Sequence, residues 1–163
     1  MRRHEGRTGV PMLRRRLTLL LCLLALAGAA AQAASTATRM RPQADMGLRV
    51  AKYARQFLGV PYRYGGASPR SGFDCSGFVA YVFRHFGVKL PHYTFAQYRR
   101  GRHVPRRRLA PGDLVFFDGL NHVGLYLGHG RFIHAPHTGA RVRVELLRFG
   151  GSYDGAVRVT RSP

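Results

Sequence analysis

The stretch Gly72-Phe73-Asp74-Cys75-Ser76-Gly77 fixes the organisation of the chain around it. Asp74 is a good helix N-cap, and Gly87 ends the helical pattern of apolar residues that follows, namely Phe78, Val79, Val82, Phe83 and Phe86. Cys75 is therefore expected in the first turn of a helix. There the unpaired backbone N–H groups and the helix dipole favour the thiolate, which is the nucleophilic form of cysteine. A buried structural cysteine is the alternative interpretation.

Composition indicates one globular domain with an unusual charge. The 163 residues suit a single domain, and a hydrophobic content of 45% is enough for a core. However, 27 Lys and Arg stand against 7 Asp and Glu, a net charge of +20. This surplus indicates anionic surroundings such as nucleic acid, an anionic membrane surface or an acidic polymer. Residues 99–108 hold six arginines and one histidine, and they form either a solvated turn or a surface for an anionic polymer.

Residues 1–33 have the pattern of an export signal. Arg14-Arg15-Arg16 precede an apolar run that begins at Leu17, and Ala31-Gln32-Ala33 fits a cleavage site. The apolar run is shorter than the roughly 20 residues that a membrane-spanning helix needs. We therefore expect a cleaved signal peptide, with an uncleaved anchor as the alternative. The pattern is compatible with either the general or the twin-arginine export route.

Export has consequences for the mature chain. Cleavage after Ala33 leaves 21 basic and 6 acidic residues, a net charge of +15, and removes Cys22. Cys75 is then the sole cysteine and cannot form an internal disulfide. We expect a periplasmic or secreted protein, for which nucleic acid is a poor partner.

The remaining sequence divides into a short linker and one domain. Residues 34–44 lack periodicity and predict a linker, and residues 45–163 form the domain. Helices come first and strands follow, which predicts an α+β fold with N-terminal helices packed on an antiparallel sheet. The expected helices are 45–58, 75–86 and 94–100, and the expected strands are 114–117, 122–127, 131–135, 141–146 and 156–160.

The segment 122–135 predicts a β-hairpin around Gly128-His129-Gly130. If these three residues form the loop, Leu127 pairs with Arg131 and paired residue numbers sum to 258. A two-residue loop would shift this register by one position and reverse the faces of one strand.

This register brings two histidines together. Side chains alternate along a strand, so His122 and His134 share one face of the hairpin, and Gly124 leaves space between them. The opposite face is apolar and is expected to join the core. The other histidines are expected to be exposed or structural; they are His4, His85, His92, His103, His129 and His137.

A cysteine at a helix start and two histidines on a sheet suit nucleophilic catalysis. Cys75 is the candidate nucleophile, one of His122 and His134 the base, and the other the residue that orients it. The same side chains could instead form a Cys-His-His zinc site with one open position. We expect catalysis without a metal or cofactor, because no paired ligand motif is present.

The chain resembles the NlpC-type cell-wall cysteine peptidases over about residues 48–147. The motifs that carry the resemblance occur in the family's order, and two histidines lie 12 positions apart; these motifs are Tyr62-Arg63-Tyr64-Gly65-Gly66, Asp74-Cys75-Ser76-Gly77-Phe78-Val79, Leu90-Pro91, Pro111-Gly112-Asp113-Leu114-Val115-Phe116-Phe117 and the hairpin His122 to Ala135. Relatives often have Arg and a hydroxyl residue after Leu-Pro, whereas this chain has His92 and Tyr93. That departure indicates a groove for a different stem peptide.

The resemblance implies a papain-like core that hydrolyses peptidoglycan stem peptides, typically between γ-D-glutamate and diaminopimelate or lysine. It also implies residue roles: Cys75 is the nucleophile, His122 the base, His134 the orienting residue and Tyr62 the side chain near the oxyanion. Asp74 and Ser76 match positions lining the substrate groove, where they could hold a free amino group.

Two alternatives remain open on the sequence. The same site could act as an amidase on the glycan–peptide link, or the domain could be a non-catalytic peptidoglycan-binding module. We expect a monomer whose Arg-rich surface binds anionic wall or membrane polymers.

Overall fold

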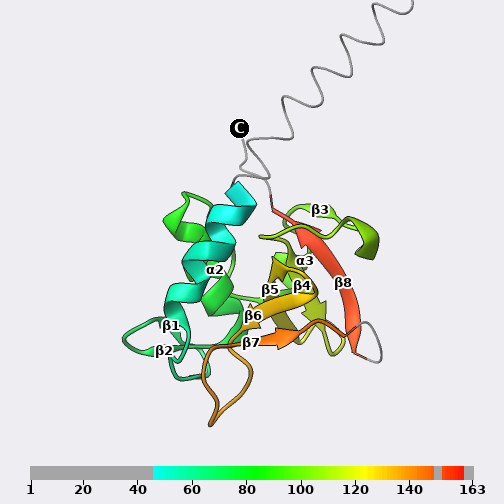
Figure 1. The fold of residues 1–163 in the computed structure, drawn as a ribbon. Helices are drawn as coiled ribbons and strands as arrows, with labels where there is room; N and C mark the ends of the chain where they lie inside the picture. The colour runs from blue at the N-terminus through cyan, green and yellow to red at the C-terminus, as the bar shows by residue number, and fades with distance from the viewer. Residues whose placement is uncertain (1–45, 149–151, 160–163) are drawn as a thin grey trace, which may run out of the picture. The chain divides into compact units, whose positions relative to one another are not determined.

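The computed structural model describes residues 46–148 and 152–159, so the expected signal peptide and linker lie outside the described residues. Six strands form an antiparallel sheet in the order β3-β8-β4-β5-β6-β7 (Figure 1). They are β3 (Arg102–His103), β4 (Leu114–Phe117), β5 (His122–Gly128), β6 (Arg131–His134), β7 (Arg143–Leu146) and β8 (Tyr153–Arg158). Helix α2 (Cys75–His85) packs against β5.

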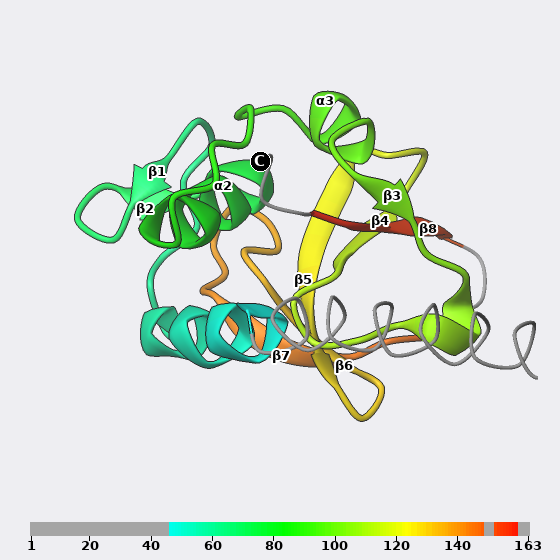
Figure 2. The ribbon, with the colours of Figure 1, turned by 90° about the horizontal axis from the view of Figure 1, so that it is seen from above.

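The two longer helical segments lie together beside the sheet. Figures 1 and 2 show the helical residues 46–54 and α2 on one side of the molecule, with β3 and β8 on the opposite side. Residues 46–54 continue into a 3₁₀ turn, η1 (Arg55–Phe57), and α3 (Thr94–Tyr98) follows α2. The predicted α+β fold with N-terminal helices on an antiparallel sheet is confirmed.

Local interactions of Asp74 and Gly87 set the two ends of helix α2. The Asp74 carboxylate accepts a hydrogen bond from the Gly77 N–H, and Gly87 adopts a φ of 78°, which favours glycine after a helix. The helix buries a stripe that includes Phe78, Val79 and Val82. Removing this apolar surface from water stabilises the contact between α2 and the sheet.

The sheet is apolar on both faces at its centre. All four residues of β4 are buried, with Leu114 and Phe116 in the core beneath α2 and Val115 and Phe117 in a second cluster on the other face. A strand buried on both sides has a continuous apolar sequence, which explains Leu114–Phe117.

The β5–β6 hairpin has the predicted register but a different turn. Leu125 pairs with Ile133, as predicted, whereas Arg131 pairs with Gly128 instead of Leu127. A bulge before Gly128 absorbs one residue, so a tight turn at His129 and Gly130, both with positive φ, coexists with the predicted faces. The expectation that a two-residue turn would reverse the faces was wrong for this reason.

Several short elements were absent from the sequence prediction. β1 (Ala67–Ser68) and β2 (Gly72–Phe73) form a hairpin just before α2. The basic segment contains β3 and a 3₁₀ turn, η2 (Arg106–Arg108), instead of being a simple loop. Among the described residues, no helix has the length and apolar character needed to cross a membrane.

Candidate active site

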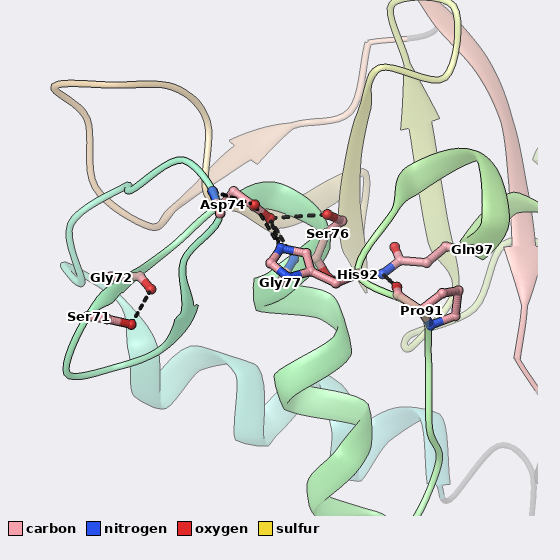
Figure 3. Close-up of polar contacts among 9 residues, drawn as sticks. Ser71, Gly72, Asp74, Ser76, Gly77, Pro91, His92 and Gln97 are labelled. Carbon is pink, nitrogen blue, oxygen red and sulfur yellow. Dashed lines mark hydrogen bonds and ion pairs between the residues drawn. The ribbon is translucent and has the colours of Figure 1, made fainter.

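The first turn of α2 is held by a network centred on the Asp74 carboxylate (Figure 3). Oδ1 accepts from the Gly77 N–H at 2.7 Å and from the Ser76 hydroxyl at 3.1 Å, and Oδ2 accepts from the Gly65 N–H at 3.0 Å. These bonds tie the glycine-rich loop before β1 to the helix start. Cys75, between Asp74 and Ser76, is thereby fixed in position.

His92 completes this network from the loop after α2. Its Nε2 lies 2.8 Å from Oδ1 and 2.7 Å from Oδ2 of Asp74 (Figure 3). A carboxylate offers about four acceptor positions. Gly77, Ser76, Gly65 and His92 together supply four donors, so the carboxylate is already satisfied within the chain.

Gln97 also holds the start of α2, a role that no sequence pattern indicates. Its fully buried amide Nε2 donates to the Ser76 carbonyl at 2.9 Å and to the Pro91 carbonyl at 2.8 Å (Figure 3). α3 therefore holds the His92 loop against the first turn of α2.

Cys75 is a buried free thiol next to β5. Burial raises its pKa, and the negative charge of Asp74 raises it further, whereas hydrogen bonds from the backbone of Val123, Ser76 and Cys75 itself lower it. The net effect is a raised pKa, so the expectation that the helix start leaves a thiolate was wrong. Burial outweighs the helix N-terminus, and the resting group is a thiol with Val123 of β5 beside its sulfur.

His122 and His134 lie together, as the hairpin register predicted. His122 Nε2 is 2.7 Å from His134 Nδ1, and the ring planes are inclined by 77°. Burial lowers the pKa of both imidazoles; for His134, with the added effect of His122, the pKa falls to about 4. Both rings are thus neutral at pH 7, and one donates a hydrogen bond to the other.

Aromatic side chains enclose this histidine pair. The Phe132 ring centroid lies 4.6 Å from that of His134, and the Phe117 centroid lies 6.2 Å from that of His122. A Cβ on Gly124 would stand 2.5 Å from the Phe132 ring. Gly124 therefore makes room for the Phe132 ring. From the sequence alone, it is expected to make room for the two histidines instead.

The histidine geometry differs from that of a zinc site. Two nitrogens bound to one tetrahedral zinc at about 2.0 Å would be about 3.3 Å apart, whereas these are 2.7 Å apart and hydrogen-bonded. In the described ranges, 46–148 and 152–159, no group of three or more His, Cys, Asp or Glu side chains is arranged to hold a metal ion.

Tyr62 lies at the same site. It is half-buried, and its backbone pairs with Phe73 in an isolated bridge. Burial raises its pKa, and the charges of Cys75 and Asp74 raise it further. Tyr62 is therefore close to both residues. The Ser76 hydroxyl, by contrast, is buried and donates its hydrogen bond to Asp74.

A cavity of about 700 Å³ adjoins the histidine pair. His122, His134 and Phe132 line it together with Glu145 of β7, a residue that the sequence did not single out. Glu145 Oε1 lies 3.5 Å from His134 Nε2 and 2.6 Å from Arg143 Nε. The register of β6 with β7 puts Glu145 opposite Phe132, one diagonal step from His134.

Residues 59–161 match the model of the NlpC/P60 family. The chain is 42% identical over 115 residues to the peptidoglycan endopeptidase RipA of Mycobacterium tuberculosis, covering 62% of this chain and 24% of that protein. It is 42% identical over 95 residues to the gamma-DL-glutamyl hydrolase of Bacillus subtilis, covering 55% of this chain and 23% of that protein.

A solved structure has the same architecture. The peptidoglycan hydrolase RipB of Mycobacterium tuberculosis superposes with a TM-score of 0.66 at 34% identity, over 75% of this chain and 69% of that one. The described domain therefore has the papain-like α+β fold that the resemblance implied. The chain spans about a quarter of the length of the RipA and glutamyl hydrolase relatives.

Proposed function

The chain belongs to the NlpC/P60 family, and from this we propose that it is a peptidoglycan endopeptidase that uses Cys75 as its nucleophile. The single observation that carries the proposal is the 2.7 Å contact between His122 Nε2 and His134 Nδ1, with His122 on the strand that bonds through Val123 to Cys75 at a helix start. With Nε2 engaged, Nδ1 is the ring nitrogen of His122 left to accept the thiol proton. The backbone of Val123, the residue after His122, already reaches the Cys75 sulfur.

The proposed reaction proceeds through a thioester. The Cys75 sulfur attacks the scissile carbonyl carbon while His122 accepts the thiol proton. The tetrahedral intermediate collapses with cleavage of the C–N bond, and His122 returns the proton to the leaving amine. Water then attacks the thioester, His122 takes a proton from this water, and the thiol re-forms.

The oxyanion of the intermediate requires preorganised donors. The backbone N–H groups of Cys75 and Ser76 lower the pKa of the Cys75 thiol, so both stabilise negative charge at the helix start. The Tyr62 hydroxyl, whose raised pKa keeps it protonated, supplies a further donor. Donors of this kind act most strongly as charge develops in the transition state.

For the scissile bond we propose the link between γ-D-glutamate and diaminopimelate. The family resemblance supports this bond, and one relative is named a gamma-DL-glutamyl hydrolase. Another relative, MepH of Escherichia coli, is named a murein DD-endopeptidase, so the choice of bond is a matter for experiment.

The substrate groove is proposed to include Asp74 and Ser76. Their mutual hydrogen bond and the contact with His92 leave Asp74 little capacity for a free amino group of the stem peptide. The amino group would have to displace His92, whose side chain is 35% exposed.

Digestion of purified sacculi and defined muropeptides tests the proposal. The parent protein and its Cys75→Ala variant are incubated separately, and products are identified by mass spectrometry. Cleavage after γ-D-glutamate by the parent alone is expected. Release of intact stem peptides would favour the amidase, and no cleavage by either protein would favour a non-catalytic binding module.

The location and partners of the protein follow from the same proposal. A peptidoglycan substrate implies action outside the cytoplasm, with residues 1–33 as the proposed signal peptide. We propose that the exposed arginines of residues 99–108 bind anionic wall or membrane polymers. Within the described part of the chain, no acidic partner is present for Arg99, Arg100, Arg102 or Arg107.

Charge-matched variants test this surface. Arg99, Arg100, Arg102 and Arg107 are replaced by Gln in one variant. The control variant replaces the same number of exposed basic residues elsewhere, at Lys52, Arg55, Arg70 and Arg131. Binding to sacculi should weaken in the first variant more than in the control, and it should fall with salt in the parent. Equal effects of both variants, or binding independent of salt, would contradict the proposal.

A further inference from the structure

The histidine pair has two possible proton arrangements. In one, His122 donates through Nε2 to His134 Nδ1, and His122 Nδ1 keeps its lone pair. In the other, His134 donates through Nδ1, and a neutral His122 must then carry its proton on Nδ1. Only the first arrangement leaves His122 able to accept the thiol proton of Cys75.

The second nitrogen of His134 decides between the two arrangements. Among the described residues, His134 Nε2 is buried and has no hydrogen bond of ordinary length, and the carboxylate oxygen of Glu145 lies 3.5 Å from it. If Nε2 carried a lone pair, it would face a carboxylate oxygen and repel it. If Nε2 carries the proton, the contact is attractive.

We propose that Glu145 is a positioning residue that fixes His134 in the Nε2–H tautomer and thereby keeps His122 Nδ1 free to act as the base. The inference rests on the proposed function, because it assigns Glu145 a role in that same site. Nothing in the three-residue arrangement of Cys75, His122 and His134 alone selects this tautomer. The tautomer of an imidazole is set by the partner of its other nitrogen.

The surroundings of Glu145 suit this role. Arg143 Nε lies 2.6 Å from the same carboxylate oxygen. Desolvation raises the pKa of Glu145, but the hydrogen bond from Arg143 and the interactions with His134 together outweigh it, so the net pKa is lowered. Glu145 therefore remains ionised and able to accept. The 3.5 Å separation is longer than an ordinary N–H···O bond, as is common for catalytic contacts before substrate binds.

Two nearly isosteric variants separate the contributions of shape and hydrogen bonding. Glu145→Gln keeps an acceptor oxygen without charge, and Glu145→Met removes the acceptor and keeps the length of the side chain. Glu145 is 38% exposed on the outermost strand β7, so both variants are expected to fold. Thermal unfolding of each confirms this before other measurements.

The first readout is the tautomer itself, which requires no substrate. Two-dimensional ¹H–¹⁵N spectra of the imidazoles at pH 7 report which nitrogen of His134 is protonated. The parent and Glu145→Gln should have the proton on Nε2, and Glu145→Met should have a mixture of tautomers. A mixture in the parent, or an unchanged Nε2–H in Glu145→Met, would overturn the proposal.

The second readout is muropeptide hydrolysis. Glu145→Met should lower kcat about tenfold with little change in KM, and Glu145→Gln should restore most of the loss. Equal losses of kcat in both variants would show that the charge of Glu145 matters and would overturn its role as a hydrogen-bond acceptor. If the parent cleaves no muropeptide, the proposed function fails, while the tautomer spectra still decide the role of Glu145.

Discussion

His122 Nε2 and His134 Nδ1 are 2.7 Å apart, on neighbouring strands and on the same face of the sheet. This hydrogen bond orients the His122 ring and leaves its Nδ1 as the available base. Because burial keeps both imidazoles neutral at pH 7, the site rests as a thiol and a neutral base instead of a thiolate and an imidazolium.

Removing the acceptor for His122 should slow catalysis. His134→Ala should lower kcat by about 100-fold with a small change in KM, since general-base catalysis by an oriented imidazole contributes on this scale. His134→Asn, which offers a carbonyl oxygen to His122, should retain more activity. Steady-state rates on a soluble muropeptide measure both, and equal rates for the two variants would contradict an orienting role.

The acid limb of the pH profile should lie below the ordinary histidine pKa of about 6.5. Burial lowers the pKa of His122, so protonation abolishes the base only at more acidic pH. The charge of Asp118 raises this pKa, and Asp118→Asn should move the limb to still lower pH. Asn tolerates the positive φ of 57° at this position. A kcat/KM midpoint above 6.5 in the parent would contradict the assignment of His122 as the base.

Protein stability should fall as the pH drops from 7 to 4. The pKa of His134 is about 4 in the folded state and about 6.5 when unfolded, so the unfolded chain binds more protons in this window. The loss for this group is on the order of 3 kcal/mol once the pH is below both values. Urea unfolding at several pH values measures the loss.

The matched control for this stability prediction is an exposed histidine. His134→Asn should flatten the dependence of the unfolding free energy on pH. His129→Asn removes an exposed imidazole at a positive-φ position that Asn tolerates, and it should leave the dependence unchanged. A similar flattening in both variants would contradict the attribution to burial of His134.

His92 should set the preference for free amino groups on the substrate. His92→Ala removes one of four donors from the Asp74 carboxylate and frees an acceptor in the groove. The KM for a stem peptide with a free N-terminal amine should then fall relative to that for its acetylated form. The KM ratio of the two substrates in parent and variant measures this, and an unchanged ratio would exclude His92 as a competitor for Asp74.

The sequence predicted the parts of the site that depend on local pattern. The start of α2 follows from the capping residue Asp74, and the shared face of His122 and His134 follows from the period of a β-strand. The bulge at Gly128 could not be predicted, because a sequence whose turn residues can adopt positive φ at successive positions is compatible with more than one type of turn. The faces were nevertheless predicted correctly.

The missed features depend on contacts between distant segments. His92 reaches Asp74 across 18 positions, and Glu145 reaches His134 only through the pairing of β6 with β7. The raised pKa of Cys75 results from packing against β5, which the helix-start argument did not include. Burial and cross-strand contacts of this kind require the tertiary structure.

A search for the thioester on Cys75 tests whether this cysteine is the nucleophile. A defined muropeptide is mixed with the enzyme, the reaction is stopped with acid within the first turnovers, and the protein is digested for mass spectrometry. Covalent catalysis by Cys75 predicts an acyl group ending in γ-D-glutamate on the peptide that contains Cys75, and neither adduct nor turnover with Cys75→Ala. Hydrolysis by Cys75→Ala at the parental rate would contradict it.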